Sequence, residues 1–314
     1  MSNMKKPVLL VMGNDLAPQA LALLGDFEVC FAGKQCSEET VLALAKEKDP
    51  VAIIVRYGKV GATIMDAAPS LKVISKHGSG IDVIDQQAAA QRGIAVKAAV
   101  GANAAAVAEH AWALILACAK AVPHLDARMR AGHWDKSTHK TIELNGRTLG
   151  VVGLGEIGRR AAATGVALGM HVIAFDPYAK TVPAGVTLVD NLPQLYRQAD
   201  VVSLHCPLTD ENRGMLNRET LAQFKDGAIL VNTARGGLID EAALAEALAS
   251  GKLYAAGLDS FVVEPMTVPH PFQQIPNLIL SPHIGGVSDA AYVNMGVGAA
   301  KNVLAVLQDA ATAA

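Results

Sequence analysis

The run Leu149-Gly-Val-Val-Gly-Leu-Gly-Glu-Ile-Gly158 decides the fold, because an apolar strand pattern passes directly into glycines spaced G-x-G-x-x-G. In this spacing Gly153 permits a tight turn, Gly155 lets the backbone approach a pyrophosphate, and Gly158 lets the next helix pack closely on the strand. The N–H groups and dipole of that helix then face the phosphates and stabilise their charge. The run therefore predicts the first strand, turn and helix of a dinucleotide-binding sheet.

An acidic residue follows at the distance where a carboxylate meets the adenosine ribose of such a nucleotide. The strand expected over His171–Phe175 ends in Asp176, and an acid there favours NAD because it repels the additional phosphate of NADP. Arg159 and Arg160, on the helix between, weaken that exclusion. The alternative is that Asp176 is only a turn residue before Pro177. We expect NAD as the cofactor.

On both sides of this motif, apolar runs alternate with helix-period segments, which is the pattern of parallel sheets with crossover helices. The sequence therefore predicts an α/β protein with two doubly wound parallel sheets. The strands expected in the sheet that contains the glycine motif are Thr148–Val152, His171–Phe175, Val201–His205, Ala228–Asn232, Ala256–Asp259 and Leu278–Ser281. Those expected in the first sheet are Val8–Met12, Val51–Arg56, Leu71–Lys76 and Ile94–Ala98, with helices around Pro18–Leu24, Glu38–Lys48 and Gln86–Arg92.

A helical stretch rich in Ala and Leu, Asn103–Ala131, lies between the two series and is expected to connect the domains. Pro123 lies inside it and must kink or divide the helix. A last helix is expected over about Ala290–Leu307, and its pattern does not say on which domain it packs.

Length and composition bound the class of protein. A chain of 314 residues exceeds the size at which one core keeps growing, so two domains are expected. A content of 51% hydrophobic but only 4% aromatic residues fits a helix-covered sheet, and a net charge of −2 argues against nucleic acid or an anionic membrane as partner. The longest uncharged apolar run, Ala111–Ala119, falls short of the roughly 20 residues that cross a bilayer.

The four cysteines, at positions 30, 36, 118 and 206, show neither paired nor metal-type spacing. Free thiols in a reducing compartment are therefore expected, which places the protein in the cytoplasm. We expect no metal site.

Arg235 follows the apolar strand Ala228–Asn232, and the carboxyl ends of strands in open α/β sheets are where ligands bind. A guanidinium holds a carboxylate by two parallel hydrogen bonds, which a lysine cannot do. A substrate that carries a carboxylate is therefore expected at Arg235. The alternative is a surface ion pair.

His283 lies just beyond another strand end, beside Gly285 and Gly286, which allow a close approach of the backbone to a ligand. Histidine is the natural proton donor near neutral pH, and Glu264 could pair with it and hold one tautomer. Alternatively, His283 terminates a strand and Glu264 is a solvated loop carboxylate.

Arg56, Lys76 and His77 lie at strand ends in the first domain. A second anionic group of the substrate, such as a phosphate, could bind there. The alternative is an ordinary solvated rim.

Taken in order, these motifs resemble the D-isomer-specific 2-hydroxyacid dehydrogenases, in the branch that contains phosphoglycerate dehydrogenase and hydroxypyruvate or glyoxylate reductase. The segments that carry the resemblance are Lys76–Asp85, Asn103 with Val107–His110, the glycine motif, His205–Thr209, Thr233–Gly237, Asp259–Pro265 and Ser281–Gly286. The resemblance implies NAD-dependent hydride transfer between the nicotinamide and C2 of a small 2-hydroxy or 2-oxo acid, with Arg235, Glu264 and His283 as the catalytic set.

The resemblance also implies the remaining contacts. Cofactor contacts are expected from Ser79, Gly153, Gly155, Glu156, Ile157, Gly158, Asp176, Cys206, Pro207, Thr233, Ala234, Arg235, Asp259, His283, Gly285 and Gly286. Substrate contacts are expected from Arg56, Lys76, His77, Ser79, Gly80 and Arg235.

The domain organisation implied is a flavodoxin-like substrate-binding domain, residues 1–101 with 287–314, and a Rossmann NAD-binding domain, residues 102–286. A homodimer is implied, with the connector helices against the partner subunit. Two other function classes stay open: a nonenzymatic NADH-sensing corepressor, and a formate dehydrogenase, against which Glu264 and Pro282 argue.

Overall fold

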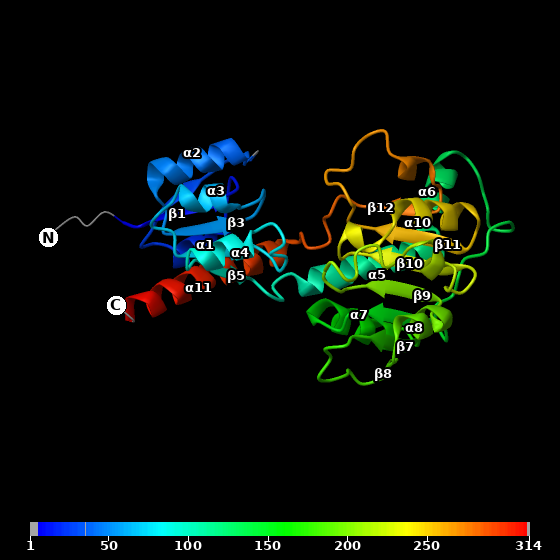
Figure 1. Cartoon of the computed structure of the whole chain (residues 1–314). Coiled ribbons are helices and arrows are strands. Elements are labelled where there is room, and N and C mark those ends of the chain that lie inside the picture. The colour runs from blue at the N-terminus through cyan, green and yellow to red at the C-terminus, as the bar shows by residue number, and fades with distance from the viewer. Residues whose placement is uncertain (1–5, 35, 313–314) are drawn as a thin grey trace. The chain divides into compact units, whose positions relative to one another are not determined.

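The computed structural model describes residues 6–34 and 36–312, which form two compact units (Figure 1). The first unit consists of the described residues up to Asn103 together with those from Val287 onward, and the second of Ala104–Gly286. Each unit is an α/β sandwich around its own parallel sheet.

The first unit has a five-stranded sheet in the order β2-β1-β3-β4-β5, with every pair parallel. This is the flavodoxin-like order, in which the direction of winding reverses between β1 and β3. Its elements are β1 (Val8–Met12), α1 (Pro18–Leu23), β2 (Glu28–Phe31), α2 (Glu38–Lys48), β3 (Ala52–Val55), α3 (Ala62–Asp66), β4 (Val73–Lys76), α4 (Gln86–Gln91), β5 (Ala95–Ala98) and α11 (Asp289–Thr312).

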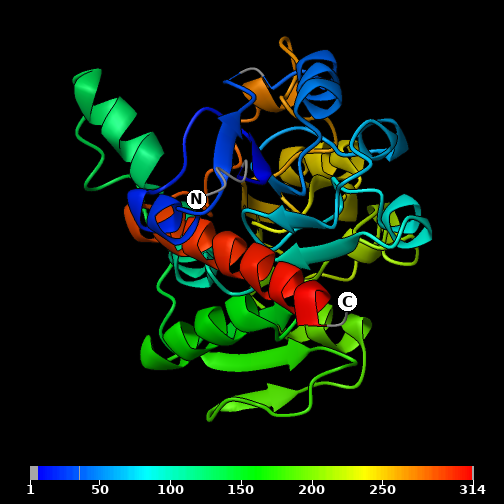
Figure 2. The same cartoon turned by 90° about the vertical axis from the view of Figure 1, so that its left-hand side faces the viewer.

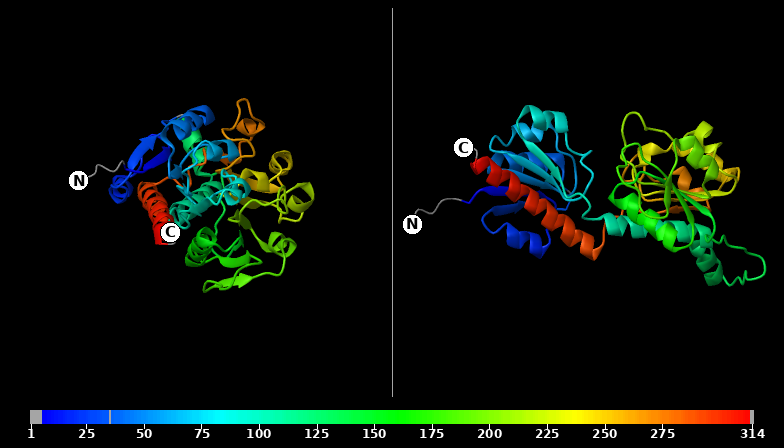
Figure 3. Two further views of the ribbon diagram at one scale, coloured as in Figure 1. Left: turned by 60° about the vertical axis from the view of Figure 1, so that its left-hand side comes forward. Right: turned by 90° about the horizontal axis from the view of Figure 1, so that it is seen from below.

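Helices cover both faces of this sheet, as period-2 alternation along its strands requires. Leu9 and Val11 of β1 pack under α1 and α11. Leu10 and Met12 of the same strand pack under α2, α3 and α4 on the other face. Figures 2 and 3 show α11, in red, running across the first sheet.

The last helix, α11, is long and apolar. By length and composition alone its Asp289–Asp309 stretch is able to span a membrane, although it contains Lys301 and is therefore not an uncharged run. Core helices pass the same test. Ala299, Ala300 and Val303 are fully buried in the core cluster that α11 shares with α1, which accounts for the apolar face of this helix.

The second unit has a seven-stranded parallel sheet in the order β12-β11-β10-β9-β6-β7-β8, which is the Rossmann order with one strand added. Its winding reverses between β6 and β9. Its elements are α5 (Ala104–Lys120), α6 (Val122–Arg130), β6 (Thr148–Val152), α7 (Glu156–Ala167), β7 (His171–Phe175), β8 (Val186–Leu188), α8 (Leu192–Gln198), β9 (Val201–Leu204), α9 (Arg218–Leu221), β10 (Ala228–Asn232), η1 (Gly236–Leu238), α10 (Glu241–Ala249), β11 (Leu253–Leu258), η2 (Pro271–Gln274) and β12 (Leu278–Leu280). The predicted α/β class with two doubly wound sheets is confirmed.

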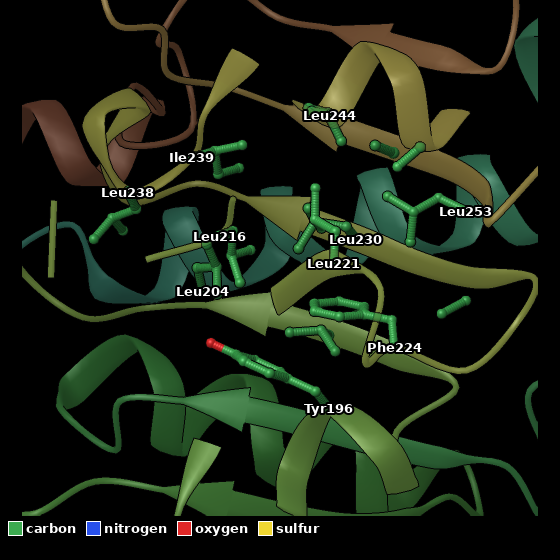
Figure 4. Close-up of a cluster of buried hydrophobic side chains, with 14 of the residues drawn as sticks. Tyr196, Leu204, Leu216, Leu221, Phe224, Leu230, Leu238, Ile239, Leu244 and Leu253 are labelled. Carbon is green, nitrogen blue, oxygen red and sulfur yellow. The ribbon is translucent and has the colours of Figure 1, made fainter. Parts of the chain in front are cut away.

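Two cores lie on the two faces of this sheet. One is shared with α5 and α7, and the other with α8, α9 and α10. Figure 4 shows the second of these, where Tyr196 stacks on Phe224 with ring centroids 4.8 Å apart, next to leucines such as Leu204 and Leu230. These cores make the strand ends that carry the candidate site rigid.

The connector divides close to Pro123, as predicted. Helix α5 ends at Lys120, Ala121 takes a positive φ of 50°, and α6 begins at Val122 with an axis bent by 58° from that of α5. None of the nine residues of α6, all of them described, is buried.

Candidate active site

The three glycines after β6 meet three different physical demands. Gly153 has a φ of +95°, and a Cβ on it would lie 2.9 Å from the backbone of His205 and Cys206. A Cβ on Gly158 would lie 1.9 Å from the carbonyl oxygen of Gly153. At Gly155, the N-cap of α7, no described atom outside the adjoining backbone lies within 4 Å of the Cβ position. The turn is thus tightly packed behind and open in front, which fits a pyrophosphate at the start of α7.

Asp176, at the end of β7, holds this turn. Its Oδ2 accepts the N–H of Leu154 at 2.7 Å and its Oδ1 accepts the N–H of Tyr178 at 2.8 Å. Each carboxylate oxygen has a further lone pair, so these bonds leave acceptor capacity for ribose hydroxyls. Asp176 therefore acts as a turn residue and also lies where the ribose of NAD is expected.

The segment after β9 forms the wall behind Gly153. Burial, and next the charge of Asp176, raise the pKa of Cys206 to about 11, so its thiol is neutral and unreactive at neutral pH.

Burial lowers the pKa of His205 to about 4. The Nε2 of His205 is 2.9 Å from the Ser203 hydroxyl, whereas its Nδ1 and the Thr233 hydroxyl are buried without a partner among the described residues. The carbonyl oxygen of Pro207 accepts from Asn212 at 2.7 Å.

Arg235 is placed by a fully buried asparagine at the end of β10. The Asn232 side chain accepts the N–H of Ala234 at 2.9 Å and donates to the carbonyl oxygen of Arg235 at 2.8 Å. The next residue, Gly236, packs so closely on another loop that a Cβ would lie 2.0 Å from the carbonyl carbon of Phe261. The Arg235 turn is therefore packed against the segment that leads to Glu264.

Glu264 and His283, 19 residues apart in the sequence, meet directly. The Oε2 of Glu264 is 2.6 Å from Nδ1 of His283, and its Oε1 accepts the N–H of Phe261 at 2.9 Å. The side chains are 35% and 47% exposed, so both are accessible to a ligand. With Nδ1 facing a carboxylate, Nε2 is the ring nitrogen available for proton transfer to a substrate.

The turn that carries His283 has an unusual backbone and a buried carboxylate behind it. His283 has a positive φ of 52°. Asp259, which is almost fully buried, accepts the N–H of Ile284 at 2.9 Å through Oδ1 and the N–H of Gly285 at 2.7 Å through Oδ2. Asp259 therefore organises this turn, and Oδ2 has a lone pair left for the nicotinamide contact expected of it.

Two further polar residues are linked to this carboxylate, His110 on α5 and Ser281 after β12. Neither was predicted as a site residue from the sequence. The Ser281 hydroxyl is 2.6 Å from Oδ1 of Asp259 and 2.8 Å from Nε2 of His110. The sequence feature that could have indicated them is that they lie in two of the segments that resemble the family, Val107–His110 and Ser281–Gly286.

The three basic residues of the first unit do not form a solvated rim. The Arg56 guanidinium pairs with the Asp15 carboxylate and lies 5.2 Å from the ring centres of Tyr57 and Tyr292. Lys76 Nζ donates to the carbonyl oxygen of Arg56 at 3.0 Å.

His77, the third member of this group, is buried. Burial, and next the positive charges of Arg56 and Lys76, lower the pKa of His77 to about 4, so it is neutral at neutral pH. The solvated-rim alternative therefore does not describe two of these residues, because Arg56 is paired and His77 is buried and uncharged. Their contact with a second anionic group of the substrate stays a prediction.

The remaining predicted contacts lie in two places. Glu156 and Ile157 are the first residues of α7, and Gly286 ends the second unit. Ser79 and Gly80 belong to the first unit, where the Ser79 hydroxyl donates to Asn103 at 3.3 Å. Their contacts with cofactor and substrate stay predictions.

Two further observations bear on the chemistry. Within the described ranges, no group of three or more His, Cys, Asp or Glu side chains is arranged to hold a metal ion. The four cysteines, all described, form no disulfide. What remains on this edge of the second sheet is a guanidinium, a carboxylate-bound imidazole and a glycine turn suited to pyrophosphate.

Comparison with known proteins gives a consistent result. A family model described as "D-isomer specific 2-hydroxyacid dehydrogenase, NAD binding domain" matches residues 112–285. A hydroxypyruvate reductase from Thermotoga maritima is 40% identical over 277 residues, which is 88% of this chain and 90% of that protein.

A D-3-phosphoglycerate dehydrogenase from Mycobacterium tuberculosis is also 40% identical, over 305 residues, which is 96% of this chain but 57% of that protein. This chain thus spans little more than half the length of that relative. Among solved structures, a protein from Thermus thermophilus superimposes with a TM-score of 0.88 and 38% identity, with 96% of this chain and 97% of that one covered.

Proposed function

The chain belongs to the D-isomer specific 2-hydroxyacid dehydrogenase family, and from this premise we propose how its residues perform the reaction and which substrate they take. As a member of the family it is an NAD-dependent oxidoreductase that interconverts 2-hydroxy and 2-oxo acids. The roles of single residues, the substrate and the assembly are the proposal.

The nicotinamide coenzyme, when bound, would supply a hydride as NADH or accept one as NAD, so the protein itself must bind the acid, orient it and move one proton. The contact between Glu264 and His283 carries the assignment of that proton. With Nδ1 held by Glu264 at 2.6 Å, His283 donates from Nε2 to the oxygen on C2 during reduction and takes the proton back during oxidation. Glu264 stabilises the charged imidazolium and fixes the orientation of the ring.

Arg235 binds the carboxylate of the substrate. Asn232 and Gly236 fix its backbone at a rigid strand end, and Nη1 of the guanidinium donates to the carbonyl oxygen of Ala234 at 2.8 Å. A guanidinium has five N–H donors in a planar arrangement, which suits the binding of a carboxylate by two hydrogen bonds. A carboxylate held at two points has its C2 oriented relative to the imidazole, which lowers the entropy lost on reaching the transition state.

The proposed substrate is a small 2-oxo acid without a phosphate, such as hydroxypyruvate or glyoxylate. The support is the state of the first unit, where Arg56 is already paired with Asp15 and His77 is neutral. The similarity to a hydroxypyruvate reductase over nearly the whole of both chains points the same way. Phosphohydroxypyruvate is the second candidate, because the phosphoglycerate dehydrogenase relative is equally identical.

A substrate panel tests this assignment. NADH absorbance is followed with glyoxylate, hydroxypyruvate and phosphohydroxypyruvate, and NAD reduction is followed with formate. We expect kcat/KM for hydroxypyruvate or glyoxylate at least about tenfold above that for phosphohydroxypyruvate, since a paired arginine offers little net charge to a phosphate. The reverse order would favour the phosphorylated substrate, turnover of formate would indicate a formate dehydrogenase, and tight NADH binding without turnover would indicate a sensor.

The assembly proposed is a homodimer through the α6 region, in a protein of the cytoplasm. Val122, Met129 and Trp134 are exposed in and just after this helix, and several large exposed apolar side chains within one short segment favour a surface that a partner covers. Light scattering should show a dimer for the natural chain and a monomer for Trp134→Asp combined with Met129→Glu. A monomeric natural chain would contradict this part.

A further inference from the structure

The position of His283 depends on a buried chain of hydrogen bonds that reaches a second histidine. The backbone amides of Ile284 and Gly285 both donate to Asp259, whose side chain is 3% exposed. Since His283 directly precedes these two residues and has a positive φ of 52°, its backbone holds this conformation only while the turn is anchored.

The proton positions in this chain of bonds follow from the distances. A carboxylate only accepts, so the Ser281 hydroxyl donates its one hydrogen to Asp259 Oδ1, 2.6 Å away. The Ser281 oxygen is then an acceptor for Nε2 of His110 at 2.8 Å, so His110 must carry a proton on Nε2. His110 Nε2 is also 3.4 Å from Asp259 Oδ1.

The packing leaves this arrangement little freedom. A Cβ on Gly285 would lie 2.8 Å from Asp259 Oδ2 and 3.1 Å from Cδ2 of the His110 ring, so the turn lies directly on both side chains. His110 comes from the middle of α5, whose buried face is fixed in the core of the second unit. It is therefore a rigid donor from outside the loops of the site.

We propose that His110 is a positioning residue for the reaction: its Nε2–H directs the Ser281 hydroxyl onto Asp259, and Asp259 in turn fixes the turn that carries His283. This inference rests on the proposed role of His283 in proton transfer. Without the donor, the Ser281 hydroxyl can also turn toward the carbonyl oxygen of Leu258, 3.3 Å away. The buried carboxylate then loses part of its anchoring, so the turn samples more conformations.

The consequence for catalysis is selective. A loosened His283 turn lowers kcat, because the imidazole is less often placed for proton transfer, whereas the carboxylate contact of Arg235 is unaffected. Loss of one partly buried hydrogen bond corresponds to roughly a tenfold fall in kcat, with the KM for the 2-oxo acid changed less than about threefold.

The test compares His110→Leu, which keeps size but removes the donor, with His110→Gln, whose amide nitrogen reaches about as far as Nε2. Amide hydrogen exchange is measured at Ile284 and Gly285 in the protein without substrate, and kcat and KM are measured with the best 2-oxo acid. We expect exchange about tenfold faster and kcat about tenfold lower in His110→Leu, with both largely restored in His110→Gln. Unchanged exchange in His110→Leu, or equal loss in both variants, would overturn the proposal.

Ser281→Ala removes the same bridge from its other end and serves should His110→Leu fail to fold. The double variant should be no slower than the slower single one, because both changes break one chain of bonds. If the losses of kcat in the two single variants added up in the double variant, His110 and Ser281 would not act through the same hydrogen bonds. If the natural chain turned over no 2-oxo acid at all, the proposed function would fail, while the exchange comparison would still judge the His110 bridge.

Discussion

The two units place the same residue types at the same structural position and give them opposite states. In each, an arginine, a histidine and an acid lie at or near the carboxyl edge of a parallel sheet. In the second unit, Glu264 pairs with His283, and both are accessible. In the first unit the acid, Asp15, pairs with the arginine, and His77 is buried. A strand end thus locates a site, whereas burial and choice of partner decide whether its groups can react.

The clearest way to break this contrast is to remove each histidine in turn. His283→Ala should lower kcat by about 10² to 10⁴, the usual contribution of a general acid. His77→Gln, the comparison in the first unit, should leave kcat within about threefold, because a neutral buried imidazole neither gives nor takes a proton at neutral pH. Steady-state rates with NADH check both. Near-normal turnover in His283→Ala would end the proposed mechanism.

The two arginines allow a second comparison. Arg235→Lys keeps the charge but loses the fork, so kcat/KM should fall by about 10², mainly through KM. Arg56→Lys should change kcat/KM for hydroxypyruvate less than about threefold, since Arg56 is already paired. A similar fall in kcat/KM at both positions would show that the arginines of the two sheets play similar roles, which would contradict the comparison.

The pH dependence of stability measures the buried state of His77 directly. Because its pKa is about 4 in the folded protein and near 6.5 when unfolded, the unfolded chain binds the extra proton between these values. The contribution of this histidine to the free energy of unfolding is therefore fully present above about pH 6.5. It is lost as the pH drops toward 4, by roughly 3 kcal/mol.

Urea denaturation at pH 7 and pH 5 tests this. The pKa of His205 is also lowered to about 4 by burial, so this residue contributes in the same direction. His77→Gln should therefore reduce the loss of unfolding free energy between pH 7 and pH 5 without abolishing it. An unchanged loss in His77→Gln would show that the imidazole is solvated after all.

The smallest expected effect concerns substrate choice. Asp15→Asn leaves Arg56 with an uncharged neighbour, so kcat/KM for phosphohydroxypyruvate relative to hydroxypyruvate should rise by about three- to tenfold. The ratio is measured in the substrate panel. A ratio that does not move would mean that Arg56 does not meet the substrate.

Much of the fold followed from pattern alone. The strands β1, β6, β7 and β10 have the predicted bounds, because each is an apolar run followed by a glycine, an acid or a polar turn. The missed strands are β2 and β8, which lie at the edges of their sheets and are at most partly buried. The apolar run of β2, Val29–Ala32, is short, and β8 has only three residues with a threonine in the middle. Helix α3 was missed for its length of five residues.

Residues of the candidate site could be selected from the sequence where they follow a strand, but not where their partner comes from far away in the sequence. Position alone selected Arg235 and His283. No local signal links Asp15 to Arg56, 41 residues apart, or His110 to Ser281, 171 residues apart. These contacts depend on which strands become neighbours, which is a property of the folded sheet.

Gly155 differs from its two neighbours in the glycine motif in a way that has practical value. Its φ of −70° suits any residue, and apart from the adjoining backbone no described atom lies within 4 Å of its Cβ position. A methyl group there would crowd an incoming pyrophosphate without disturbing the chain that surrounds it. Gly155→Ala is therefore expected to give a folded protein that no longer binds the coenzyme. Any effect of coenzyme on the conformation or assembly of the natural chain can be judged against this variant.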